Sequence, residues 1–142
     1  MGVSAKGLAV GDTRELLLVD DLKRTQMVMY AGASGDYNPL HTDDTFTKEM
    51  TPYPGVFAHG MLSMGYVGEF LHRAAGGVAN VRKFRARFAK LTWPGDVVSC
   101  KGTVTAVRRE DGRTIVDCDV WTETQAGERK VVGSATLALP AA

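Results

Sequence analysis

The most constraining feature of this sequence is a strict two-residue period that begins after Val81. The first segment alternates basic and apolar residues in the order Lys83, Phe84, Arg85, Ala86, Arg87, Phe88. Segments 98–106, 116–121 and 131–137 alternate in the same way, and turns at Gly112 and Gly127 separate them. Successive side chains of a strand point to opposite faces, so this pattern is typical of strands with one buried face. We therefore expect an antiparallel meander.

A helix is predicted directly before this sheet, over His59–Ala75. Its apolar residues lie on all sides, and Glu69 is its only charged residue before Arg73. A helix that is apolar all round is usually buried. A buried helix against a one-sided antiparallel sheet is an α+β arrangement. With 142 residues, the chain is expected to form one domain over 1–142.

The amino-terminal half is predicted to contain one strand and one further helix. Thr13–Val19 is rich in Leu and Val and favours a strand. Asp20 and Asp21 could then cap a helix over Leu22–Ser34, which Gly35 would end. The stretch 36–57 contains three prolines and is expected to be a loop.

Charge and cysteine content exclude several classes of function. Lys and Arg number 17 and Asp and Glu 16, a net charge of +1, whereas nucleic-acid and membrane-surface binders usually carry a basic excess. The longest charge-poor stretch, 56–68, is shorter than the roughly 20 residues that cross a bilayer. Cys100 and Cys118 lie in predicted strands, so we expect reduced, buried thiols in a cytoplasmic protein. The three histidines lack metal-ligand spacing, and no metal or other cofactor is expected.

The densest polar cluster is the segment 34–41, which contains Asp36 and His41 five positions apart. Pro39 disfavours a helical conformation at Asn38, so the chain must turn there. A carboxylate and an imidazole on one stiff loop could share a water molecule and act as a general acid–base pair. The same residues could instead only form a turn, because Asx-type turns are common. The spacing alone leaves both interpretations open.

Two longer motifs resemble those of the MaoC-like, (R)-specific enoyl-CoA hydratases. One is Tyr30-Ala31-Gly32-Ala33-Ser34-Gly35-Asp36-Tyr37-Asn38-Pro39-Leu40-His41-Thr42-Asp43, and the other is Ala58-His59-Gly60-Met61-Leu62. The turn Trp93-Pro94-Gly95-Asp96 is also similar to the family's turn before a strand, so the resemblance covers most of the chain. It implies the hot-dog fold, in which a curved antiparallel sheet wraps a long central helix.

The resemblance also implies a reaction and a set of catalytic residues. Asp36 and His41 would activate water for syn addition to a trans-2-enoyl thioester, giving an (R)-3-hydroxyacyl thioester. Asn38 would orient this water or the loop, or serve only the turn. The N–H of Gly60, where the central helix begins, would polarise the thioester carbonyl, since helix amino termini present free N–H groups. Such chemistry requires no cofactor.

Five further residues are candidates for the substrate-binding region. His59 is expected to hydrogen-bond the overhanging loop rather than to act as a second catalytic histidine. Met61 could line a malleable acyl tunnel or simply fill the core. Pro54 could form a stiff rim over that tunnel. Arg85 and Arg87 could attract the phosphates of coenzyme A or a carrier-protein arm, or form a solvated outer face of the sheet.

The alternatives are a hot-dog acyl-CoA thioesterase, a dehydratase subunit of fatty-acid elongation that acts on acyl-carrier-protein thioesters, and a non-catalytic partner subunit. Asp36 and His41 speak against the first and the last. An open-edged sheet should pair with a second copy or with a homologous hot-dog subunit, so a homodimer or a heterodimer is expected. Acyl-chain length, the choice between coenzyme A and carrier protein, and the physiological direction remain open.

Overall fold

The computed structural model describes residues 5–140, which form five strands, three α-helices and two short 3-10 helices. In chain order these are β1 (Thr13–Val19), α1 (Arg24–Ser34), η1 (Pro39–His41), α2 (Asp44–Met50), α3 (Gly60–Ala75), η2 (Val78–Asn80), β2 (Val81–Phe88), β3 (Val98–Glu110), β4 (Arg113–Glu123) and β5 (Arg129–Pro140). The predicted first strand has the bounds of β1, and the predicted central helix differs from α3 by one residue.

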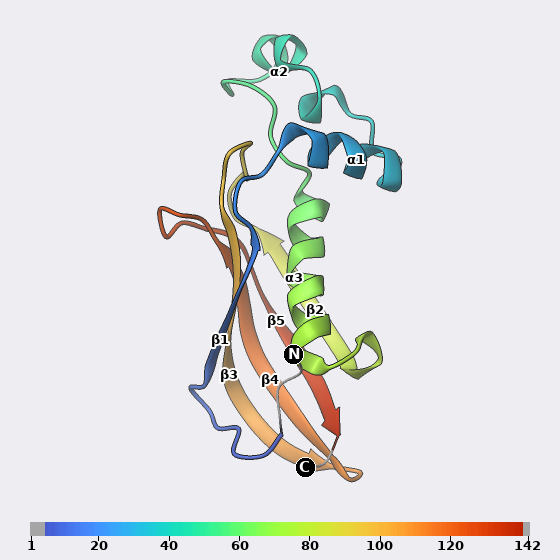
Figure 1. The fold of residues 1–142 in the computed structure, drawn as a ribbon, viewed down its shortest axis with the longest axis vertical. Helices are drawn as coiled ribbons and strands as arrows, with labels where there is room; N and C mark the ends of the chain where they lie inside the picture. Colours follow the sequence, from blue (N-terminus) through green and yellow to red (C-terminus); the bar gives the residue numbers. More distant parts are fainter. Residues whose placement is uncertain (1–4, 141–142) are drawn as a thin grey trace.

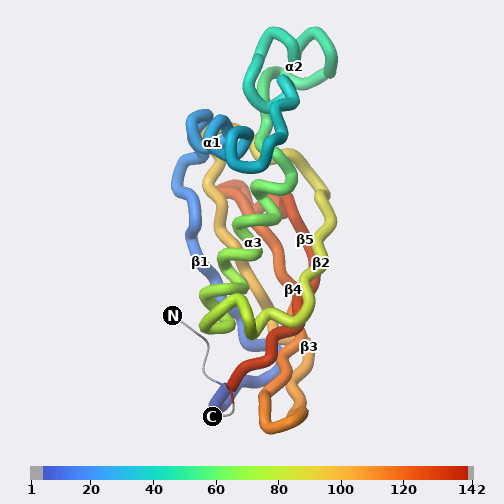
Figure 2. The backbone as a smooth tube through the Cα atoms, turned by 90° about the vertical axis from the view of Figure 1, so that its right-hand side faces the viewer, coloured from blue at the N-terminus to red at the C-terminus, as the bar shows by residue number. Residues whose placement is uncertain are grey.

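The strands form one antiparallel sheet in the order β1-β3-β4-β5-β2. The meander prediction is correct for β3, β4 and β5, which follow one another. It is wrong for β2, which pairs with β5 at the far edge, although β3 follows it in the chain. The connection 89–97 is long enough to carry the chain from this edge to the other side of the sheet. Figure 2 shows β1 and β2 at opposite edges.

Helix α3 lies along the concave face of the curved sheet, which confirms the α+β hot-dog architecture (Figure 1). Its buried residues Val67, Phe70 and Leu71 pack against alternate residues of the strands. Each fully buried side chain of this size stabilises the fold by about 1.5–3 kcal/mol. The sheet comes close enough that a Cβ atom at Gly102 would lie 3.0 Å from the Phe70 ring. Glycine at that position therefore allows the close packing of helix and sheet.

The expectation that this helix is buried on every side is wrong for the single chain. Met61 is 55% exposed, and Gly65 is exposed one turn further on. The sheet covers only one side of α3, and these residues lie on the opposite side. Phe88, at the end of β2, is also 51% exposed. An apolar surface is thus left open beside the start of α3.

The structure corrects two details of the amino-terminal half. Helix α1 begins at Arg24 rather than Leu22, and neither aspartate caps it; the side-chain oxygen of Gln26 instead accepts the backbone N–H of Lys23 at 2.9 Å. Gly35 ends the helix in the left-handed region (φ 75°), as predicted. The stretch 36–57 contains α2, a helix of seven residues that the sequence analysis did not predict. Asp43 caps it by accepting a hydrogen bond from the Phe46 N–H.

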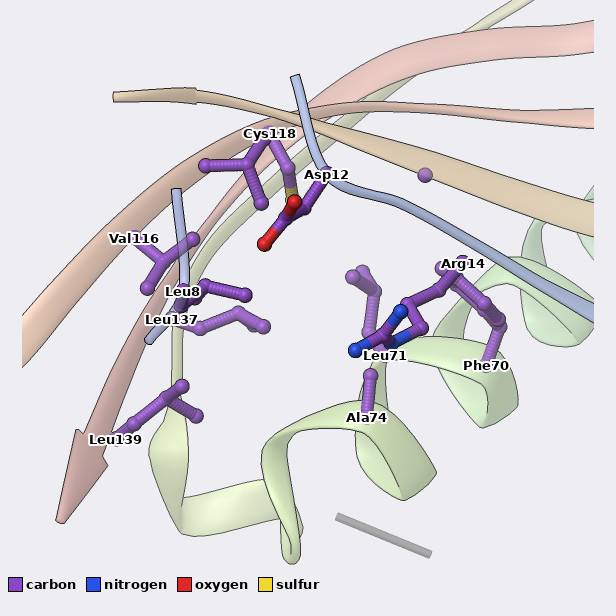
Figure 3. A pocket seen from close by; sticks show the side chains of 12 residues that line it. Leu8, Asp12, Arg14, Phe70, Leu71, Ala74, Val116, Cys118, Leu137 and Leu139 are labelled. Atoms are coloured by element: carbon purple, nitrogen blue, oxygen red, sulfur yellow. The ribbon is translucent and has the colours of Figure 1, made fainter. Parts of the chain in front are cut away.

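Both cysteines are free and buried, as predicted. Burial raises the pKa of Cys100 to about 12 and that of Cys118 to about 11. Cys118 borders a small apolar cavity between the carboxyl-terminal half of α3 and the sheet (Figure 3). The cavity measures about 40 Å³, and its lining is almost entirely apolar.

Candidate active site

The loop between α1 and η1 holds Asp36 in a defined turn. One carboxylate oxygen of Asp36, Oδ1, accepts the N–H of Asn38 at 3.2 Å. Oδ1 of Asn38 in turn accepts the N–H of Leu40 at 3.1 Å and caps η1. The second Asp36 oxygen, Oδ2, stays available, and the side chain is 52% exposed. Asn38 therefore forms the turn that presents Asp36 and His41 on the same side of the loop.

His41 is oriented by a backbone carbonyl from the segment that precedes α3. Its Nδ1 lies 2.7 Å from the Phe57 oxygen. A carbonyl only accepts hydrogen bonds, so Nδ1 carries the proton and Nε2 keeps a lone pair in the neutral ring. Burial lowers the pKa of His41 below its ordinary 6.5, opposed by the Phe57 hydrogen bond. His59 lowers this pKa further, and Asp36 raises it. His41 is thus prepared to act as a base near neutral pH.

The free Nε2 of His41 faces the free Oδ2 of Asp36 at 3.9 Å. This separation is too long for a direct hydrogen bond. A water oxygen about 2.8 Å from both atoms would bridge them at an angle of roughly 90°. The side chain of His41 is 10% exposed, whereas that of Asp36 opens to solvent. The two residues therefore form an accessible position for one polarised water molecule.

His59 joins this loop to the start of α3. Its Nε2 donates to the backbone oxygen of Asp36 at 3.1 Å, the hydrogen bond to the overhanging loop that the sequence analysis expected. Its ring stacks on His41 with 3.8 Å between centroids, and Tyr30 contacts it edge-on. Only 1% of the residue is exposed, and its Nδ1 has no hydrogen-bond partner among the described residues. His59 therefore supports the site from behind.

Asp36, His41 and His59 also form a group that could be considered for metal binding, with one ligand atom from each within 4.8 Å. The sequence spacing gave no sign of this group, because His41 and His59 come together only when the loop folds back over the start of α3. However, Nε2 of His59 is committed to the Asp36 carbonyl, and Nδ1 of His41 to Phe57. The remaining donors are fewer than the three or so protein ligands of a catalytic zinc site. This donor set suits acid–base chemistry better than a resident metal.

Gly60 is the first residue of α3, directly beside this pair. Its N–H has no hydrogen-bond partner among residues 5–140, as expected for the first turn of a helix. The sixteen-residue helix adds the positive end of its dipole at this point. A Cβ atom at position 60 would lie 3.1–3.3 Å from the Phe88 ring. The absence of a side chain thus keeps the N–H accessible next to Phe88.

The other predicted substrate-binding residues are spread around the molecule. Met61 is exposed on the first turn of α3, and Pro54 is exposed on the bend before Gly55. Arg85 and Arg87 point away from α3, on the outer face of the sheet. There they line a hollow of about 500 Å³ with Arg129 and other residues. Met61 and Pro54 therefore lie on the two segments that flank His59 and Gly60, whereas the two arginines lie on the outer face of the sheet.

Sequence reasoning missed the residues that orient His41. Phe57 contributes its carbonyl oxygen, for which the sequence carries no side-chain signal, and its ring also contacts His41 edge-on with 5.2 Å between centroids. Its ring joins Tyr53 and Trp93 in an aromatic cluster with centroids 5.4–6.0 Å apart. The prolines around Tyr53 were the only available signal for a shaped segment there. The cluster packs the segment that carries Pro54 against Trp93 of the connection 89–97.

A family model described as the MaoC like domain matches residues 7–126. The chain belongs to the MaoC-like domain family. It is 29% identical to an (R)-specific enoyl-CoA hydratase of Aeromonas caviae over 97% of the chain and 100% of that protein. It is 31% identical to the 3-hydroxyacyl-thioester dehydratase Y of Mycobacterium tuberculosis over 80% of the chain. That match spans only 39% of the mycobacterial protein.

The fold comparison agrees with the family assignment. The solved structure of the (R)-hydratase from A. caviae involved in PHA biosynthesis superimposes with a TM-score of 0.81. Sequence identity is 28%, and the match covers 96% of this chain and 100% of that one. Within residues 5–140, the MaoC-like chain has no helix of the length and apolarity that a membrane span requires.

Proposed function

We propose that this MaoC-like domain catalyses the reversible hydration of trans-2-enoyl thioesters to (R)-3-hydroxyacyl thioesters. The observation that carries the proposal is the 3.9 Å gap between Asp36 Oδ2 and His41 Nε2, beside the free N–H of Gly60. The reaction needs two elements: an acid–base pair that activates water, and a hydrogen-bond donor for the developing oxyanion. The hydratase and dehydratase names of the relatives support the same reaction.

In the hydration direction, the bridging water attacks C3 of the enoyl group. Its oxygen forms the new C–O bond, and the Asp36–His41 pair accepts the proton that it loses. The electron pair of the double bond moves onto the thioester oxygen as an enolate. A proton from the pair then reaches C2 on the same face, so that one water is added in total. A positioned acid–base group contributes on the order of 10²–10⁴ to the rate.

The enolate charge is stabilised at the start of α3. The Gly60 N–H points out of the first helical turn, where the helix dipole also favours negative charge. Removing a comparable donor costs other enzymes on the order of 10²–10³ in rate. Met61, exposed one residue later, contacts the acyl chain, and Pro54 forms the rim of its entrance. His59 contributes indirectly, since its buried ring holds the loop.

The active unit contains two hot-dog subunits. Both edge strands of the sheet, β1 and β2, lack a further strand among the described residues. Met61 and Phe88 leave an apolar surface open beside Gly60, and exposed apolar surface of this kind is typical of an interface. A second subunit over this surface would enclose the acyl chain. Sedimentation measurements on the purified chain would show whether it pairs with itself or requires a homologous partner.

The deciding experiment follows the ultraviolet absorbance of the conjugated enoyl thioester with crotonyl-CoA and octenoyl-CoA. We expect wild-type protein to remove this absorbance and to form the (R)-3-hydroxyacyl product. Asp36→Asn and His41→Ala should lower the rate by about 10²–10⁴ without loss of folding. Release of free coenzyme A would instead indicate a thioesterase. No turnover of either thioester, even after carrier-protein thioesters are supplied, would refute the proposal.

A further inference from the structure

Asp44, the first residue of α2, uses both carboxylate oxygens to hold segments outside its own helix. Its Oδ1 accepts the N–H of Val56 at 2.9 Å, and its Oδ2 pairs with Arg24 of α1 at 2.8 Å. The helix itself does not need this carboxylate, because Asp43 is the residue that caps α2. Asp44 thus connects α1, α2 and the segment that leads into α3.

The backbone closes tightly around this carboxylate. A Cβ atom at Gly55 would lie 2.6 Å from Oδ1 of Asp44, so a side chain at position 55 would displace the carboxylate from this place. Val56 is 2% exposed, and the backbone that follows is buried as far as His59. The Val56 hydrogen bond is the main cause that lowers the pKa of Asp44, and the Arg24 contact adds to it. The Asp44 carboxylate therefore holds the backbone at Val56, where the exposed loop residues 52–54 give way to the buried segment 55–59.

One residue further along, the peptide between Phe57 and Ala58 is the group that orients His41. Its carbonyl accepts the His41 Nδ1 proton at 2.7 Å. Its N–H donates to the backbone oxygen of Thr92 at 2.8 Å. A peptide is planar, so a rotation of this unit moves both hydrogen bonds together. Thr92 fixes it from the sheet side, and Asp44 fixes the chain that enters it from the loop side.

We propose that Asp44 is a positioning residue for His41, acting through the Val56 N–H and the Phe57 carbonyl. The kinetic consequences of this inference rest on the proposed hydratase function. Its structural consequences rest on the hydrogen bonds alone. Without the Asp44 anchor, the Phe57 carbonyl gains freedom and His41 is less firmly held against Asp36. A misplacement of about 1 Å in a catalytic group can cost on the order of 10² in rate.

The effect on pH dependence has a definite sign. Three groups next to His41 act on its pKa: the Phe57 carbonyl, the His59 ring at 3.8 Å and the Asp36 carboxylate at 3.9 Å. Loss of Asp44 weakens only the first of these. Because the Phe57 hydrogen bond raises the pKa of His41, a weaker bond lowers that pKa. The acid limb of the rate profile therefore moves to lower pH while the maximal rate falls.

The test compares Asp44→Ala with Asp44→Asn, and Asp43→Ala is the matched control on the same helix. We expect Asp44→Ala to lower kcat by roughly 10- to 100-fold with a smaller change in KM, and to move the acid limb. Asp44→Asn keeps an oxygen that can accept the Val56 N–H and should recover most of kcat. Asp43→Ala removes the helix cap and should lower the melting temperature while the acid limb stays in place.

Nitrogen-15 spectra of the His41 ring, recorded on the substrate-free protein, separate this inference from the proposed function. Asp44→Ala should change the Nδ1 signal and lower the titration midpoint of His41, whether or not the chain turns over any enoyl thioester. An unchanged Nδ1 signal and midpoint in folded Asp44→Ala protein would overturn the inference. An equal shift of the midpoint in Asp43→Ala would also overturn it, since the effect would then come from α2 as a whole.

Discussion

The close approach of Gly60 to Phe88 predicts that the effect of Gly60→Ala on stability depends on the residue at position 88. A methyl group at position 60 would meet the Phe88 ring at 3.1–3.3 Å, a few tenths of an ångström closer than ordinary contact. Overpacking in a closed core costs about 1–3 kcal/mol, and because Phe88 is 51% exposed its ring can move away in part, so the cost here lies near the lower end, about 1 kcal/mol. Replacing glycine by alanine in a helix returns up to about 1 kcal/mol. Gly60→Ala should therefore destabilise the protein by about 0–1 kcal/mol.

In a Phe88→Ala background, the overpacking term disappears and the helix-propensity term remains. Gly60→Ala should then be neutral or stabilising by up to about 1 kcal/mol. Urea unfolding of the four proteins measures this cycle through the shift in midpoint at constant slope. The rate of enoyl-thioester hydration should show the same pattern: Gly60→Ala lowers the rate, and adding Phe88→Ala partly restores it. A coupling energy below about 0.5 kcal/mol would refute the reasoning, because it would mean that Phe88 does not constrain position 60.

Three other predictions concern titratable groups. The neutral form of His41 is the base, and burial lowers its pKa below 6.5, so activity should fall only when the pH drops below that value. Steady-state rates measured against pH would show this fall. Cys100 and Cys118 should not react with a thiol reagent at neutral pH until the protein unfolds, since burial raises each pKa. Hydrogen bonds from Lys130 and Lys90 lower the pKa of Glu128 to about 2. The ionised carboxylate therefore stabilises the fold above pH 4.5, and this contribution is lost as the pH falls toward 2. In Glu128→Gln protein the free energy of unfolding, measured by denaturant at several pH values, should depend less on pH over this range.

The elements with a regular pattern could be predicted closely from the sequence. The bounds of β1, the start of α3 within one residue and the left-handed end of α1 at Gly35 all follow from local rules. Helix α2 was missed because seven residues between prolines show too little periodicity to distinguish a helix from a loop. The edge position of β2 was missed because alternation reports which face is buried, not which strand is the neighbour.

The candidate site divides in the same way. Asp36, Asn38 and His41 lie within one loop, so their turn is a short-range property that the sequence determines by itself. The tautomer of His41 depends on a carbonyl sixteen residues away, and its stacking on His59 depends on how the loop meets α3. The Asp44 anchor likewise joins residues twelve positions apart. Such contacts depend on how separate segments pack, and only the tertiary structure decides that.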